Sequence, residues 1–177
     1  MKDYNKQIAH IPHFHIIRSA ETRLIGDYLK GTEGPYLDIG CGDGGFASTV
    51  GVSGVYGIDI DREALSRLKL GGTYAGAVYA SASEVPFKSG FFKTAFSNCA
   101  IEHMDGLKSV LKETARVLKP GGEFVFTAPT PAFFKAVEQD EVLRKLGINT
   151  QAIIDEYNNF HRHVNILGFE DWRKNLE

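Results

Sequence analysis

A dense cluster of glycines directly after a short apolar segment constrains this chain more than any other feature. The segment Pro35–Ile39 is apolar except for Asp38, and residues 40–45 include four glycines. Glycine enters backbone conformations that other residues avoid, so such a cluster makes a tight turn. A strand, a glycine turn and a following helix, here Phe46–Val50, together predict the first unit of an α/β fold.

Apolar strand segments and segments of helical spacing alternate along the chain as far as Pro129. This alternation predicts a Rossmann-like α/β fold, a doubly wound and mostly parallel sheet with helices on both faces. Its ligand crevice would lie beyond the carboxyl ends of the strands. The expected strands are Pro35–Ile39, Gly54–Asp59, Tyr74–Tyr79, Ala95–Asn98 and Glu123–Ala128, and the expected helices are His15–Lys30, Phe46–Val50, Arg62–Leu70 with Asp61 as N-cap, Leu107–Leu118, Ala132–Leu146, Thr150–Asn159 and Phe169–Leu176.

Length and composition exclude several classes of protein. The 177 residues suit one domain, and 20 Lys and Arg against 22 Asp and Glu argue against binding along a nucleic-acid backbone. The longest apolar runs are far too short to cross a bilayer, and no apolar signal core follows the N-terminus. Two cysteines are typical of a reduced protein rather than a disulfide scaffold, so we expect a cytoplasmic chain without a membrane span.

The glycine turn fits two kinds of ligand. Gly40, Gly42 and Gly45 match the dinucleotide fingerprint G-x-G-x-x-G, which would indicate an NAD-dependent oxidoreductase. However, Asp38 and Asp43 would repel a pyrophosphate seated at the start of a helix. Their charges favour a ligand that carries an ammonium and a sulfonium and no phosphate, such as S-adenosylmethionine.

Five segments between Gly34 and Pro129 resemble, in order and spacing, the motifs of class I S-adenosylmethionine-dependent methyltransferases of the small-molecule and quinone-type branch. The segments are Leu37–Ala47, Val55–Asp61, Glu84–Phe87, Asn98–Met104 and Arg116–Gly122. The resemblance implies S-adenosylmethionine as methyl donor, S-adenosylhomocysteine as product and a small-molecule or lipid-like acceptor. It also implies a single methyltransferase domain over 1–177, made of a helical cap at 1–33, a cofactor-binding core at 34–129 and a helical lid or substrate segment at 130–177.

The resemblance assigns the glycine loop to the amino-acid part of the cofactor. Asp38 would hold the methionine ammonium, directly or through water. Gly40, Cys41 and Gly42 would form the loop around the ligand, where a Cβ at either glycine would collide with it.

The ribose and adenine parts would contact the ends of the next strands. Asp59 would accept hydrogen bonds from both ribose hydroxyls. Many members of the family have an aspartate at the position of Ser81, where it bonds the adenine amino group, and the neutral Ser81 weakens that contact. The further residues that the resemblance assigns are Ile60 on one face of the adenine, Ala82 and Ser83 bordering the other, and Asn98 and Cys99 beside the reactive methyl group.

His103 is the candidate catalytic residue. Its imidazole would act as a general base if the acceptor is a hydroxyl or a protonated amine. The alternative is that His103 only lines the pocket. The two pairs His13/His15 and His161/His163 suggest a metal, but no further ligand motif joins them, so no metal is expected.

Departures from the family pattern leave a second class of function open. Lys93 takes the place of a common acid, which puts the local strand pairing in doubt. The usual last two strands are missing after the helix Phe169–Leu176, so the fifth strand would keep a free edge. Either the sequence is a truncated product, or a second copy of the chain covers this edge. A non-catalytic S-adenosylmethionine-binding or interaction module is therefore the alternative to an active enzyme.

Overall fold

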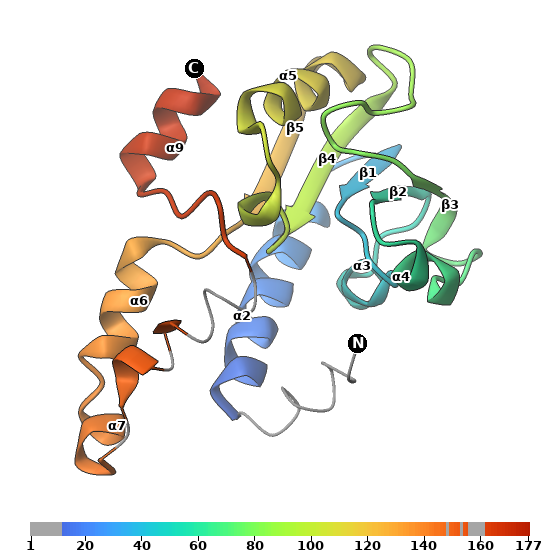
Figure 1. Ribbon diagram of the computed structural model, residues 1–177. Helices are drawn as coiled ribbons and strands as arrows, with labels where there is room; N and C mark the ends of the chain where they lie inside the picture. Colours follow the sequence, from blue (N-terminus) through green and yellow to red (C-terminus); the bar gives the residue numbers. More distant parts are fainter. Residues whose placement is uncertain (1–11, 148, 153, 156–161) are drawn as a thin grey trace.

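One five-stranded sheet organises the molecule. The structure is a computed structural model that describes residues 12–147, 149–152, 154–155 and 162–177. The sheet has the order β3-β2-β1-β4-β5, and all neighbouring strands are parallel, which confirms the doubly wound α/β fold (Figure 1). The strands are β1 (Tyr36–Ile39), β2 (Val55–Asp59), β3 (Tyr74–Tyr79), β4 (Phe92–Asn98) and β5 (Leu118–Thr127).

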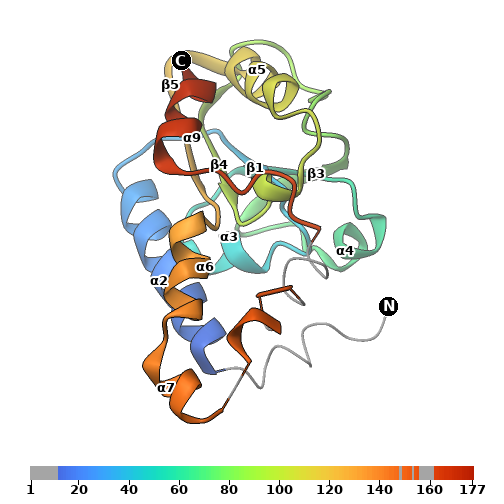
Figure 2. The same ribbon diagram turned by 60° about the vertical axis from the view of Figure 1, so that its left-hand side comes forward.

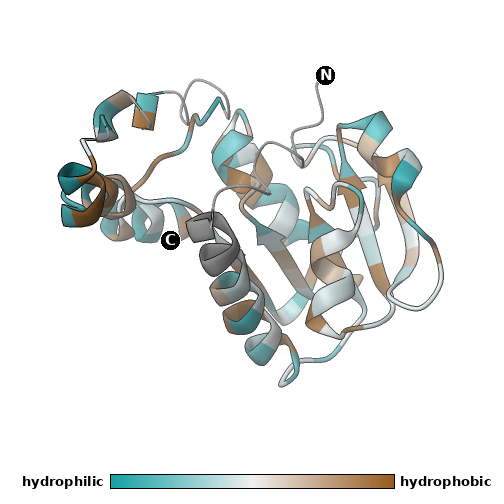
Figure 3. Ribbon diagram, turned by 90° about the horizontal axis from the view of Figure 1, so that it is seen from below, coloured by the Kyte–Doolittle hydropathy of each residue, from teal (hydrophilic) through white to brown (hydrophobic). Residues whose placement is uncertain are grey.

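Helices cover both faces of this sheet. Neighbouring residues of a strand point to opposite sides, so each face buries its own set of side chains against its own helices. Tyr36 belongs to the hydrophobic cluster beneath α2 (Pro12–Leu29) and α3 (Gly45–Val50), whereas Leu37 belongs to the cluster beneath α5 (Leu107–Val117). Figure 3 shows hydrophobic residues along the strands and mixed hydrophobic and hydrophilic residues on the peripheral helices. No helix in the described part of the chain combines the length and the apolar character that a bilayer span requires.

The short helix α4 (Arg62–Arg67) begins where the sequence predicts. Asp61 caps it, since its Oδ1 accepts hydrogen bonds from the backbone N–H groups of Glu63 and Ala64 at 2.9 and 3.0 Å. The helix ends three residues before the expected Leu70, because Leu68 adopts an extended backbone and the next residues form isolated bridges to Tyr74.

The edge strand β5 is longer than expected. It begins at Leu118, which pairs with Phe92, and a register shift precedes the pairing of Thr94 with Glu123. Lys93 lies in that shift, but β4 stays bonded to both of its neighbours, so the expected disturbance of pairing at Lys93 is confined to this irregularity. In the described part of the chain no strand pairs with the outer side of β5.

The segment after β5 is helical, with one difference from expectation. In place of a single helix over Ala132–Leu146 the chain forms α6 (Pro131–Glu138) and α7 (Glu141–Lys145), because Asp140 starts a new helix by accepting a bond from Leu143 N at 2.9 Å. Figure 1 shows both extending beyond the carboxyl ends of β4 and β5. Of the expected helix Thr150–Asn159, residues 150–152 and 154–155 are helical and the rest lies outside the described residues.

The last helix, α9 (Phe169–Leu176), has the predicted bounds. It packs against the sheet through Trp172, which is buried, with its ring centroid 4.8 Å from that of Phe126 on β5. Figure 2 shows α9 and α5 on the same side of the molecule. The exposed Phe169 begins the helix.

Candidate functional site

The glycine loop is tied directly to the end of β2. The backbone N–H groups of Gly40 and Cys41 both donate to the carbonyl oxygen of Ile58, at 2.9 and 3.1 Å. One residue further on, Gly42 N donates to Asp59 Oδ2 at 2.7 Å. The loop and the acidic end of β2, which the sequence predicts to share a site, are therefore in contact.

Asp59 is half-buried and still has room to accept further hydrogen bonds. Its second carboxylate oxygen, Oδ1, accepts from Asp61 N at 2.8 Å. An ionised carboxylate offers about four lone-pair positions, so the bonds from Gly42 and Asp61 leave capacity for two hydroxyl donors. The next side chain, Ile60, is 70% exposed, which leaves an aliphatic surface beside the carboxylate.

The two first glycines of the loop serve different purposes. Gly42 has φ +54°, and a Cβ built there meets no atom within 4 Å, so space is open in front of the loop. At Gly40, with φ +80°, a Cβ would lie 2.4 Å from the Cβ of Ala100. Packing against the segment after β4 is therefore a further reason for glycine at position 40, and the expected close approach of a ligand there stays a prediction.

Asp38 lies behind the loop rather than in the open space. Its carboxyl is buried and accepts a hydrogen bond from the Tyr74 hydroxyl at 2.5 Å. Burial raises the pKa of Asp38 to about 7, the Tyr74 hydrogen bond opposes that rise, and the charge of Asp59 adds to it. The Asp38 carboxyl is covered in this structure, and its expected contact with an ammonium group, directly or through water, stays a prediction.

Cys41 can offer a ligand only its backbone. Its Sγ packs into the space that Gly57 leaves, where an added Cβ would lie 2.5 Å from the sulfur. Burial and the nearby carboxylates of Asp38 and Asp59 raise the pKa of the Cys41 thiol, which makes it unreactive. Cys41 and Cys99 are not joined in a disulfide.

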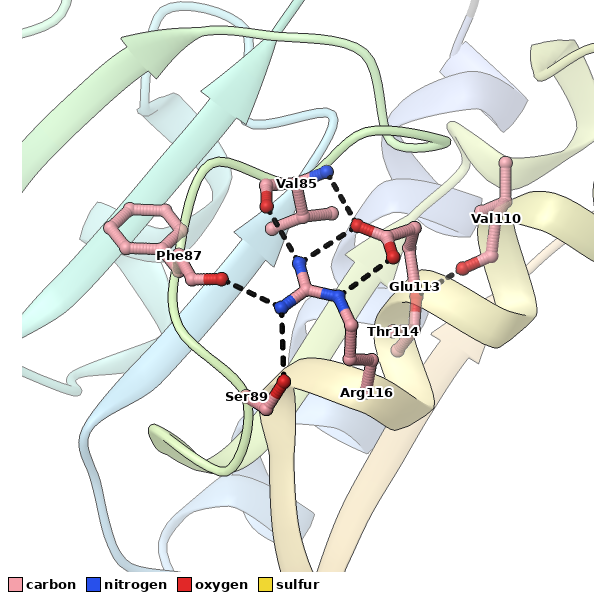
Figure 4. Close-up of polar contacts among 7 residues, drawn as sticks. All are labelled: Val85, Phe87, Ser89, Val110, Glu113, Thr114 and Arg116. Carbon is pink, nitrogen blue, oxygen red and sulfur yellow. Dashed lines mark hydrogen bonds and ion pairs between the residues drawn. The ribbon is translucent and has the colours of Figure 1, made fainter.

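The loop after β3 is held by an arginine on α5 (Figure 4). The Arg116 guanidinium donates to the carbonyl oxygens of Val85 at 2.8 Å and Phe87 at 2.9 Å, and it pairs with Glu113 at 2.7 Å. Glu113 in turn accepts from Val85 N at 3.0 Å. This arrangement fixes the loop that contains the candidate adenine-side residues.

Those adenine-side residues form a small turn. Ser81 Oγ lies 2.8 Å from Ser83 Oγ and accepts from Ser83 N at 3.2 Å. Ser81 is exposed and Ala82 is buried, so the serines and not the alanine side chain face the solvent-accessible side of this turn.

At the end of β4 the structure adds Thr127 and Glu21, which the sequence did not indicate, as partners of the predicted residues Asn98 and Cys99. Asn98 Oδ1 accepts a hydrogen bond from Thr127 Oγ1 at 2.9 Å. Cys99 has φ +47°, a conformation that non-glycine residues adopt mainly at constrained sites. Its Sγ donates to Glu21 Oε1 of α2 at 3.1 Å. No local motif marks Glu21, because only the fold brings α2 to this strand end.

The candidate base His103 lies in the 3-10 turn η1 (Ile101–His103) that follows β4. The turn is close to the glycine loop, since Ala100 and Met104 flank Gly40. The His103 side chain is 33% exposed, and its ring stacks on that of His163 with centroids 4.9 Å apart. Burial and the neighbouring His103 lower the pKa of His163 to about 4.

These contacts bring the glycine loop, the end of β2 and the turn after β4 together, and comparison with known proteins identifies the family. Residues 37–126 match the family described as the methyltransferase domain, which is half of the chain. The chain belongs to this family. The match spans β1 to β5 and so includes the glycine loop, Asp59 and η1.

Curated relatives of this methyltransferase domain are longer proteins. The 27-O-demethylrifamycin SV methyltransferase of Amycolatopsis mediterranei is 30% identical over 150 residues, which are 76% of this chain and 53% of the relative. The O-methyltransferase resE of Aspergillus sclerotiorum is 31% identical over 112 residues, 56% of this chain and 42% of the relative. The chain thus spans about half the length of the curated relatives it matches.

Solved structures share the fold of the methyltransferase domain. A SAM-dependent methyltransferase from Thermotoga maritima has a TM-score of 0.64 and 18% identity, with 98% of this chain and 77% of that chain covered. The YcgJ protein from Bacillus subtilis has a TM-score of 0.62 and 20% identity, covering 89% of this chain and 66% of that chain. At these identities the comparison shows the fold alone.

Proposed function

We propose that this protein transfers a methyl group from S-adenosylmethionine to a small-molecule or lipid-like acceptor. The observation that carries the proposal is the bond from Gly42 N to Asp59 Oδ2, because it joins the open glycine loop to a half-buried carboxylate at one strand end. Membership of the methyltransferase domain family supports the reaction class. The printed names of two relatives, an O-methyltransferase and a 27-O-demethylrifamycin SV methyltransferase, support a small acceptor.

The residues at this edge fit the chemistry of the proposed cofactor. The open space at Gly42 admits the amino-acid part, while Asp59 has two acceptor positions for the ribose hydroxyls. The exposed Ile60 provides an apolar surface for one face of the adenine, and the Ser81–Ser83 turn borders the other. Asp38 acts as a positioning residue, because it is buried behind the loop and bonded to Tyr74.

For methyl transfer the protein has mainly to align the methyl donor with the acceptor. S-adenosylmethionine would supply a methyl group on a sulfonium: the acceptor atom would bond to the methyl carbon in line with the carbon–sulfur bond, and the sulfur would leave as the thioether of S-adenosylhomocysteine. Holding the two reactants in that geometry can contribute about 7–11 kcal/mol. His103, exposed at the turn after β4, is the residue that would remove a proton from a hydroxyl acceptor.

The helical segment 130–177 is the proposed substrate segment and lid. Phe133 and Phe134 on α6 lie edge to face with centroids 5.3 Å apart, and the Phe134 ring is 6.3 Å from that of His163. This segment therefore supplies aromatic surface next to the candidate base. The helical cap at 1–33 takes part through Glu21, whose carboxylate reaches Cys99.

Calorimetric titration tests the proposal. S-adenosylmethionine and S-adenosylhomocysteine should bind the wild-type chain, and Asp59→Ala should weaken both. Charge-assisted hydrogen bonds are worth about 1.5–3 kcal/mol each, so the loss of two should weaken binding by about a hundredfold or more. The matched control is Asp171→Ala, which removes an exposed carboxylate from α9 on the β5 side of the sheet.

The outcomes separate the competing functions. Binding of NAD in place of the sulfur nucleosides would indicate an oxidoreductase instead. Binding of the nucleosides without turnover of any acceptor in a metabolite extract would indicate a non-catalytic module. Equal affinity of the wild type and of Asp59→Ala for S-adenosylmethionine and S-adenosylhomocysteine would contradict the proposal that Asp59 belongs to the cofactor site.

A further inference from the structure

Three side chains with metal-ligating groups meet at the turn after β4. They are Glu102, His103 and His163, and one ligand atom from each lies within 4.8 Å of the others. Glu102 is buried, while His103 is partly exposed and His163 is half-buried. The cluster therefore has a carboxylate on its inner side and an imidazole that reaches toward solvent.

The chain is built to hold His163 at this place. The backbone N–H groups of Val164 and Asn165 both donate to the carbonyl oxygen of Glu102, at 2.8 and 3.0 Å. The Asn165 side chain spans the turn, since its Nδ2 donates to the carbonyl oxygens of Ile101 at 2.9 Å and Met104 at 2.7 Å. Four hydrogen bonds thus fix the residue pair directly after His163 to η1, and preorganised ligands of this kind favour ion binding.

The three groups form a ligand set typical of transition metals. Two imidazoles and one carboxylate are the protein ligands of a common class of catalytic zinc site, which keeps one further position open. Ligands on one tetrahedral zinc ion are about 3.3 Å apart at bond lengths near 2.0–2.1 Å. In this structure the ligand atoms lie within 4.8 Å of one another and the two imidazoles are stacked, so the rings would have to turn for their nitrogens to face one ion.

We propose that Glu102, His103 and His163 form a binding site for a divalent transition-metal ion of the zinc class. Imidazole ligands favour such ions over Mg²⁺ and Ca²⁺, which prefer oxygen ligands. His103 and His163 would each contribute one ring nitrogen and Glu102 one carboxylate oxygen. The site leaves at least one coordination position for water or an external ligand.

The position of the cluster would allow an acceptor to occupy the open coordination position of the ion. Ala100 and Met104, on either side of η1, flank Gly40 of the glycine loop, so the cluster lies next to the proposed cofactor crevice. A bound ion could orient an oxygen atom of the acceptor and lower the pKa of a hydroxyl there. This last role rests on the proposed function, whereas metal binding itself does not.

No sequence motif indicates this cluster, because its histidines lie far apart in the chain. Local motifs such as His-x-His were the available signal, and they pair His161 with His163. The structure instead pairs His163 with a turn that lies far earlier in the chain. The contacts of Val164 and Asn165 with this turn make the two positions neighbours.

Zinc titration of the untagged, chelator-treated full chain tests the site. We expect one equivalent of Zn²⁺ to bind, with much weaker binding of Mg²⁺. Glu102→Gln and His163→Asn should each weaken Zn²⁺ binding by about a hundredfold, since each removes one of three protein ligands. Glu84→Gln is the matched control, because Glu84 is an exposed carboxylate outside the cluster, and Cys99→Ser excludes the thiol as a ligand.

A second measurement does not depend on the folding of any variant. In long-range ¹H–¹⁵N spectra of the wild-type chain, Zn²⁺ should shift the ring nitrogens of two histidines at one equivalent. Zinc binding that is unchanged in Glu102→Gln and His163→Asn would overturn the proposal, and so would the absence of shifted imidazoles. If the chelator-treated chain still binds S-adenosylhomocysteine, such a failure concerns the metal site alone.

Discussion

Asp38 and Asp59 carry the same side chain at the ends of adjacent strands, and burial gives them different roles. Asp59 is half-buried and bonded by backbone N–H groups of the loop and of the residue before α4. Asp38 is covered and bonded by the Tyr74 hydroxyl. The motif alone predicts that both acids contact the cofactor, because the sequence contains no signal for the Tyr74 hydroxyl, which arrives from β3.

The pH dependence of stability should report the burial of Asp38. Its pKa is about 7 in the folded chain against 3.8 as the ordinary value, so the folded state retains a proton that the unfolded state releases. The stabilising contribution of that proton is complete below pH 4 and is lost as the pH rises through 7. A shift of about 3 units corresponds to about 4 kcal/mol.

Urea unfolding at pH 4.5, 6 and 8 checks this expectation. Asp38→Asn keeps an acceptor for Tyr74 and carries no titrating proton, so its free energy of unfolding should fall less than that of the wild type between pH 4.5 and 8. Asp171→Asn, at an exposed position, should follow the wild type. Parallel curves for wild type and Asp38→Asn would show that the carboxyl is hydrated.

The loop after β3 depends on α5 for its conformation. Arg116 satisfies two loop carbonyls while its pairing with Glu113 lowers the pKa of that carboxyl, so one guanidinium links the loop to the helix. The sequence places Arg116 in a family motif without revealing its partners. The helices and strands could be predicted from the local periodicity of apolar residues. Contacts between elements far apart in the chain could not be predicted in this way.

Replacing this arginine should therefore destabilise the chain. Arg116→Lys keeps the charge but cannot form the same fork of hydrogen bonds, and we expect a loss of about 1–3 kcal/mol in the free energy of unfolding. Arg173→Lys is the matched control, because Arg173 makes only exposed ion pairs with Glu170 and Glu177 in the described structure and should change stability by less than about 0.5 kcal/mol. Denaturant titration measures both, and equal losses would mean that the loop does not depend on the guanidinium.

At the scale of the whole molecule, the doubly wound sheet could be predicted from the sequence. The helices that follow β5 could be predicted only in part. Five strand segments with intervening helices predict the doubly wound sheet because right-handed crossovers leave few alternatives. The break between α6 and α7 was missed, since Asp140 reads as a polar surface residue until it is seen to cap α7. The cluster at η1 required tertiary contacts of Asn165 that no pattern in the sequence indicates.

The outer edge of β5 should promote self-association. No strand covers it within the described residues, and Trp172 of α9 packs on the Phe126 ring. Unpaired edges of this kind bind other strands readily. We expect sedimentation velocity to show a fraction of dimer that increases with protein concentration. Amide hydrogen exchange at Phe124–Phe126 should become slower over the same range of concentrations. A chain that stays monomeric, with rapid exchange at all concentrations, would contradict this expectation.

The double anchoring of Asn165 has a kinetic consequence. Because the Asn165 side chain bonds the carbonyls of Ile101, the first residue of η1, and of Met104, directly after η1, the segment that carries His163 cannot move away without breaking its bonds to the turn beside the glycine loop. If the acceptor enters and the product leaves next to η1, both steps would require these Asn165 hydrogen bonds to break. The rate at which they break would then set an upper limit on the turnover rate.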